Sequence, residues 1–226
     1  MSRVLPILFN TDMVRAILDG RKTVTRRLIK VPPYYPHFYK LHDNADGAIT
    51  GTRNRLYAGF YKDDQIFYID GGKHVDAVYY QAPCEPGDIL YVRETWCKTD
   101  CFGACNGYVY RSEKADTLKI LEETTGFIPK WHPSIHMPKE AARIWLKVKD
   151  VRVERLQEIT IDDIRNEGLT SMSVHAGDME IALEEWKILW NSTIKNSDLD
   201  RYGWDASPWV WVIEFERCEK PEGWCV

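Results

Sequence analysis

The chain has 226 residues, of which 30 are basic and 34 acidic, so its net charge is −4. A hydrophobic content of 44% excludes a disordered chain, and six cysteines are too few for a disulfide-dense mini-protein. This negative net charge disfavours nonspecific binding to duplex DNA, because proteins that bind DNA phosphates usually carry an excess of basic residues. The sequence shows neither a membrane span nor a secretory signal, so we expect a cytoplasmic protein without a membrane partner.

The first third of the chain predicts a strand, a helix and a second strand. Residues 3–9 form an apolar strand, and Asn10 or Thr11 can then cap a helix that Gly20 ends. The β-prone residues 23–29 follow directly. Residues 30–55 are rich in proline, glycine and aromatic residues and predict a loop. Its aromatic segment 34–39 could be a lid or a cover over apolar surface.

The remaining elements follow from alternation and capping. Strands are expected at 89–96, 108–111, 142–153 and 209–217, and a short helix at 113–123. Thr160 and Asp163 resemble a capping box that opens a helix ending at Gly168. A longer helix at 178–193 carries tryptophans on one apolar stripe. Without repeats or linkers, residues 1–226 are read as a single domain, a twisted mixed sheet or small barrel with flanking helices.

The junction between the first helix and the second strand concentrates polar chemistry. Residues 20–27 read GRKTVTRR, which places four cations and two hydroxyls within eight residues. On a strand, Thr25 and Arg27 share one face, while Val24 and Arg26 share the other. One face is then either a polar site or an ordinary solvated strand edge.

Glu94 is the second candidate. Alternation along residues 89–96 places it with Leu90 and Val92 on one side of a strand. A carboxylate among apolar neighbours is either paired structurally, for instance with Arg143, or shifted in pKa and suited to proton transfer.

Together these features resemble a known family. The spacing Gly20-x-Lys22-x-x-Thr25-x-Arg27, followed by a Pro-Gly-Asp turn at 86–88 and a strand carrying Glu94, resembles the signature of the ASCH superfamily. The run at 133–138 with Arg143, and the run at 151–156, are similar to prophage-encoded members. The resemblance implies a mostly β (α+β) fold, namely a PUA-like small β-barrel with flanking helices and long insertions at about 30–84 and 97–130.

The resemblance also implies an RNA- or nucleoside-related role, with an amidohydrolase acting on a modified nucleoside such as N4-acetylcytidine as the enzymatic version. Its catalytic set falls on Lys22, Thr25 and Glu94. Lys22 would take the proton from Thr25, whose alkoxide attacks the acetyl carbonyl, and Glu94 would orient the lysine or protonate the leaving amine. Substrate binding would fall to Arg27, Arg26, Trp96 and Arg143, and no cofactor is required. The alternative is a non-catalytic RNA- or nucleotide-binding module of phage origin.

The cysteines offer a different hypothesis. The spacing C-x3-C-x3-C over residues 97–105 could bind a structural zinc that staples a loop, and the favoured ligands are Cys84, Cys97, Cys101 and Cys105. That would make the chain a zinc-stapled interaction protein. Otherwise these residues are free thiols.

The tryptophans divide into two groups. Trp186 and Trp190, and at least one of Trp209 and Trp211, are expected in the core. Trp96 and Trp131 are the better candidates to wall a base pocket.

Overall fold

The computed structural model describes residues 2–30, 58–61, 66–69, 78–100 and 107–222. They form two compact units, each assembled from segments distant in sequence. Unit 1 comprises residues 1–23, 87–148 and 215–226, and unit 2 comprises residues 24–86 and 149–214. Segments of the two units therefore alternate along the chain.

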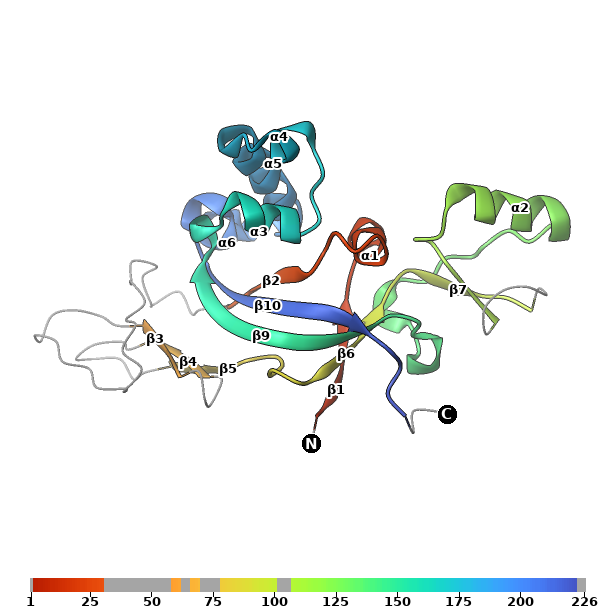
Figure 1. The fold of residues 1–226 in the computed structure, drawn as a ribbon, viewed down its shortest axis with the longest axis horizontal. Coiled ribbons are helices and arrows are strands. Elements are labelled where there is room, and N and C mark those ends of the chain that lie inside the picture. Colours follow the sequence, from red (N-terminus) through yellow and green to blue (C-terminus); the bar gives the residue numbers. More distant parts are fainter. Residues whose placement is uncertain (1, 31–57, 62–65, 70–77, 101–106, 223–226) are drawn as a thin grey trace, which may run out of the picture. The chain divides into compact units, whose positions relative to one another are not determined.

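The strands are β1 (Val4–Leu8), β2 (Val24–Leu28), β3 (Ala58–Tyr61), β4 (Ile66–Ile69), β5 (Val78–Gln81), β6 (Ile89–Arg93), β7 (Trp96–Lys98), β8 (Tyr108–Tyr110), β9 (Trp145–Arg155) and β10 (Trp209–Cys218). The α-helices are α1 (Thr11–Leu18), α2 (Ala115–Thr125), α3 (Ile161–Asn166), α4 (Met172–Ala176), α5 (Met179–Ser192) and α6 (Leu199–Tyr202). Short 3-10 segments occupy Ser134–His136, Lys139–Ala141, Leu156–Glu158, Asn196–Asp198 and Trp204–Ala206. Figure 1 traces these elements along the chain.

Hydrogen bonding orders five strands as β1-β6-β9-β10-β2, and β3-β4-β5 and β7-β8 form smaller antiparallel sheets. The sheets and helices confirm the expected mostly β α+β fold. Over the residues that the structure describes, the five-stranded sheet has β1 and β2 as its edges and forms no closed barrel. No helix within those same residues is long and apolar enough to cross a membrane.

Unit 1 is built on β1 and β6, which pair in parallel from Val4 opposite Ile89 to Leu8 opposite Arg93. β6 pairs antiparallel with the first residues of β9. The helix α1 follows β1, and Asn10 caps it as expected, accepting a hydrogen bond from the Met13 backbone at 2.8 Å. The core on this side gathers Tyr110, Met137 and Trp145 from β8, β9 and the segment between them.

Unit 2 pairs β2 antiparallel with β10, from Val24 opposite Glu214 to Leu28 opposite Val210. Its core joins these strands to the helices α3, α4 and α5, which lie together in Figure 1. The residues that form this core are Val24, Leu156, Ile159, Ile164, Val174, Ala182, Trp186, Trp190, Val210 and Val212. The apolar stripe predicted on α5 is therefore a core stripe, and Trp209 and Trp211 are buried as well.

One expected element was wrong, and one observed sheet was not predicted. The strand expected over 89–96 is two strands, because β6 ends at Arg93 and β7 begins at Trp96. Trp96 therefore does not continue the buried face of Leu90, Val92 and Glu94. The expected insertion at about 30–84 contains a three-stranded sheet, β3-β4-β5, that the sequence did not predict.

Candidate functional site

Lys22 is the first candidate residue, and the end of α1 determines its position. Gly20 adopts a φ of +75°, which reverses the chain at low steric cost. The backbone amides of Arg21 and Lys22 then both donate to the carbonyl of Ala16, at 2.8 and 3.0 Å. This tight exit carries the Lys22 side chain inward, and the residue is only 2% exposed.

The Lys22 amine lies against an aromatic ring. Its Nζ is 5.7 Å from the centroid of the Phe9 ring, within the range of a cation–π contact. Phe9 is itself buried and packs on Phe215, with centroids 6.1 Å apart. A solvated strand edge is therefore the wrong description of this junction, since Lys22, Thr25 and Arg26 are all buried.

Glu94 occupies a second buried polar position in the same unit. Its side chain is 1% exposed, and Arg143 forms a bidentate salt bridge with it. Arg143 Nε donates to Glu94 Oε1 at 2.9 Å, and Arg143 Nη2 donates to Oε2 at 3.2 Å. The Ser112 hydroxyl also donates to Glu94 Oε2. The carboxylate is thus fixed as an acceptor in one orientation.

Arg143 is the centre of this cluster. Its Nη2 also donates to the Ser112 hydroxyl at 2.9 Å, and its Nη1 approaches Glu113 at 3.4 Å. The guanidinium carbon lies 3.9 Å from the centroid of the Tyr110 ring, and the Tyr110 hydroxyl donates to the Ala141 carbonyl. Burial alone lowers the pKa of Arg143, but the contacts with Glu94 and Glu113 raise the pKa overall. Burial raises the pKa of Tyr110.

Phe9 connects the two buried polar positions. The Phe9 amide donates to the Arg93 carbonyl at 3.2 Å, so the parallel pairing of β1 and β6 continues one step beyond Leu8. The Phe9 backbone therefore lies beside Arg93, the residue before Glu94, and the Phe9 ring contacts the Lys22 amine. Lys22 and Glu94 thus both reach the same end of the β1–β6 pair.

Thr25 and Arg27 belong to unit 2. Thr25 is buried opposite Ile213 on β10, and it follows Lys22 by three residues in the chain. Arg27 pairs with Trp211 in the same register. Burial lowers the pKa of Arg27, and the neighbouring Glu167 carboxylate offsets part of that effect.

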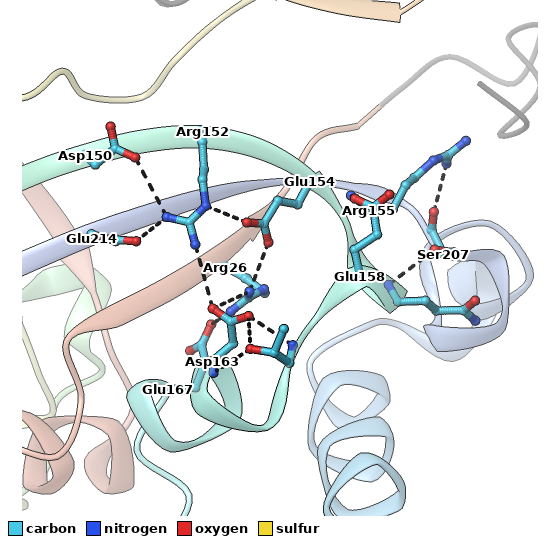
Figure 2. Close-up of polar contacts among 12 residues, drawn as sticks. Arg26, Asp150, Arg152, Glu154, Arg155, Glu158, Asp163, Glu167, Ser207 and Glu214 are labelled. Carbon is cyan, nitrogen blue, oxygen red and sulfur yellow. Dashed lines mark hydrogen bonds and ion pairs between the residues drawn. The ribbon is translucent and has the colours of Figure 1, made fainter. Parts of the chain in front are cut away.

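Arg26 points to the other face of β2 and meets a set of carboxylates (Figure 2). Its side chain is fully buried, and it contacts Glu154 at 3.0 Å, Asp163 at 3.2 Å and Glu167 at 3.4 Å. Arg152 extends the network to Glu154 and Glu214. These contacts do not support a substrate-binding role for Arg26, because its charge is already compensated within unit 2.

Of the four cysteines proposed as zinc ligands, two lie within the described residues and two lie outside them. Cys84 and Cys97 are both buried, and the Cys97 Sγ donates to the Lys98 carbonyl. Cys101 and Cys105 lie outside the described residues. Within the part of the chain that the structure describes, no group of three or more histidine, cysteine, aspartate or glutamate residues could hold a metal.

Sequence reasoning found Glu94 and offered Arg143 as one example of a structural partner, but it missed Phe9, Ser112 and Glu113. Phe9 was read only as the end of an apolar strand. Ser112 and Glu113 stand in a turn after β8, and a serine followed by a glutamate in a turn carries no signal of its own.

No protein-family model, curated protein or solved structure matches this chain. The resemblance to the ASCH superfamily therefore rests on the quoted residues alone.

Proposed function

We propose that this protein is an ASCH-type amidohydrolase that removes the acyl group from a modified nucleoside such as N4-acetylcytidine, with a PUA-like fold of which the five-stranded sheet is part. The observation that carries the proposal is the burial of a lysine amine and a glutamate carboxylate at one end of the β1–β6 pair. Placing a lysine and a glutamate in water-poor surroundings costs free energy, and enzymes accept that cost where the groups act on a substrate.

The proposed reaction assigns one role to each residue of the set. Lys22 takes the proton of the Thr25 hydroxyl, and the Thr25 oxygen forms a bond to the acetyl carbon. The C–N bond breaks, and the protonated Lys22 amine gives this proton to the leaving N4 nitrogen, which becomes the amino group of cytidine. Water then hydrolyses the acyl–threonine ester to acetate. The role of Thr25 rests on the family resemblance.

The contacts of Glu94 favour one of its two expected roles. Both of its oxygens already accept hydrogen bonds, from Arg143 and Ser112. A carboxylate held in this way acts as an acceptor, so we assign Glu94 to orienting its neighbours and not to protonating the leaving amine. Arg143 is then a positioning residue, which differs from the substrate-binding role that the resemblance implies.

The experiment is the release of acetate from N4-acetylcytidine by the full chain and by Lys22→Ala, Thr25→Ala and Glu94→Gln. We expect turnover to fall by about 10²-fold or more in each variant, the usual loss when a proton-transfer group or a nucleophile is removed. Lys119→Ala is the matched control, because Lys119 is exposed on α2 and its charge pairs with the exposed Glu123.

The proposed amidohydrolase activity would be contradicted if the wild-type chain released no acetate, or if Lys22→Ala released acetate at the wild-type rate. The non-catalytic nucleotide-binding module would then be favoured. In that case Thr25→Ala should reduce binding by only about 1 kcal/mol, the value of one hydrogen bond.

A further inference from the structure

The face of β7 and its two neighbouring segments carries an aromatic row outside the Lys22–Glu94 site. Trp96 pairs directly with Tyr110 on β8, and Lys98 pairs with Tyr108. On its other side Trp96 forms an antiparallel bridge with His132, through reciprocal backbone hydrogen bonds of 3.2 and 2.8 Å. β7 is therefore the middle of three extended segments, and Trp96 is the central side chain of the row.

The rings of this row pack against one another. The Trp96 and His132 centroids are 5.0 Å apart with the planes 32° from parallel, and the Tyr108 and Trp96 rings form an edge contact, with centroids 5.6 Å apart and planes at 63°. All three side chains are partly exposed, whereas Tyr110 and Trp145 in the adjacent core are 2% and 4% exposed. The Trp96 indole N–H is turned into the protein and is buried, so the ring offers its apolar surface at the row.

Two exposed lysines flank the row at the same end. Lys98 follows Trp96 by two residues, and Lys130 precedes His132 by two residues. Because the bridge between the two segments is antiparallel, both lysines lie on the same side of the Trp96–His132 pair along the strands. Like charges on adjacent segments are unfavourable by themselves, and an anion placed near them removes that cost.

We infer that this surface binds single-stranded nucleic acid, with bases stacked on the row formed by Trp96, Tyr108 and His132 and backbone phosphates near Lys98 and Lys130. Aromatic rings beside cations are the combination that binds unpaired strands, because every base offers a face for stacking. A duplex keeps its base faces inside the helix, so the surface selects unpaired strands.

The same surface leads to the candidate site. Tyr110, the direct pairing partner of Trp96, stacks on the Arg143 guanidinium that holds Glu94. Where it names the substrate, this inference rests on the proposed function: the modified nucleoside would be presented within an unpaired strand, with neighbouring bases on the aromatic row.

The test measures fluorescence anisotropy of labelled ten-nucleotide strands, oligo(A) and oligo(dA), with the full chain. We expect both to bind, and Trp96→Leu to weaken binding about 10-fold, which is within the effect of one stacked base. Lys98→Ala combined with Lys130→Ala should weaken binding at low salt and reduce the slope of log K against log salt by about 1.4, two phosphate contacts at about 0.7 each. Preference for the ribose strand would identify RNA as the source.

Two controls keep this test independent of folding and of catalysis. Tyr79→Ala removes an aromatic side chain that is 63% exposed on β5, and it should leave binding unchanged. The double lysine variant changes only exposed positions and should melt like the wild-type chain. The inference is overturned if neither strand binds, or if the wild-type chain, Trp96→Leu and the double lysine variant bind equally well. Strand binding without acetate release would instead reject the proposed hydrolase and leave the strand-binding surface standing.

Discussion

At the scale of single residues, the pair of Arg143 and Glu94 is a contact that stabilises unit 1 through a buried carboxylate. Glu94 is 1% exposed, and Arg143 is its cationic partner within the described residues. Arg143→Ala leaves a buried carboxylate without that partner, so we expect a loss of about 3 kcal/mol in the free energy of unfolding. Urea denaturation followed by circular dichroism measures this loss.

The double variant Arg143→Ala with Glu94→Leu is the control for that prediction. Removing both partners leaves no buried charge, so it should be more stable than Arg143→Ala alone. A double variant that is as unstable as the sum of the two single variants would show that the pair itself contributes little.

Sequence reasoning reached this pair only in part. The alternation of Leu90, Val92 and Glu94 predicted burial correctly, and the structure pairs Glu94 with Arg143, which the sequence offered as one example of a partner. Ser112 could not be predicted, because it meets Glu94 only through the turn after β8 and that turn follows no pattern in the sequence. The charge pattern alone would have placed Lys22 in solvent, whereas the structure buries it.

At the scale of secondary-structure elements, Asp163 at the N-terminus of α3 is expected to make the stability of the fold depend on pH. Burial by itself raises the pKa of Asp163, but hydrogen bonds from Thr160 and the charge of Arg26 lower it overall from its usual 3.8. A carboxyl group whose pKa is lower in the folded state stabilises the fold above the unfolded pKa, and this stabilisation is lost as the pH falls through the folded pKa.

The variant Asp163→Asn keeps an acceptor for the Thr160 amide but removes the charge that faces Arg26. We expect it to cost about 1 kcal/mol near pH 7 and progressively less as the pH falls below 4, so the two stability curves converge in acid. Urea midpoints between pH 2.5 and 7 provide the measurement. Asp162→Asn is the matched control, because Asp162 is an exposed neighbour in the same helical turn; parallel curves for wild type and Asp163→Asn would contradict the prediction.

The elements with local signals were predicted well. The Asn10 cap, the box formed by Thr160 and Asp163, and the alternation in β9 and β10 all appear in the structure. The sheet β3-β4-β5 was missed because its strands have four residues each, which is too short for alternation to stand out. The end of β6 was missed because the alternation of the sequence continues past Arg93 to Trp96, and the pairing with β1 shows where the ladder stops.

At the scale of the whole molecule, the order of segments predicts how the chain unfolds. Unit 1 is assembled from three stretches and unit 2 from two, and β9 and β10 each contribute residues to both. Because β9 and β10 are each continuous through both units, unfolding of one unit disrupts strands that also belong to the other unit. We therefore expect one cooperative transition, as for a single domain.

Tryptophan fluorescence and far-ultraviolet circular dichroism should give coincident urea curves. The comparison is sensitive to both units, because Trp96 and Trp145 belong to unit 1, while Trp186, Trp190 and Trp209 belong to unit 2. Arg143→Ala in unit 1 and Asp163→Asn in unit 2 should each shift the whole transition to lower urea without splitting it. If either variant instead separates the two probes or produces a second transition, the units unfold independently and the chain contains two domains.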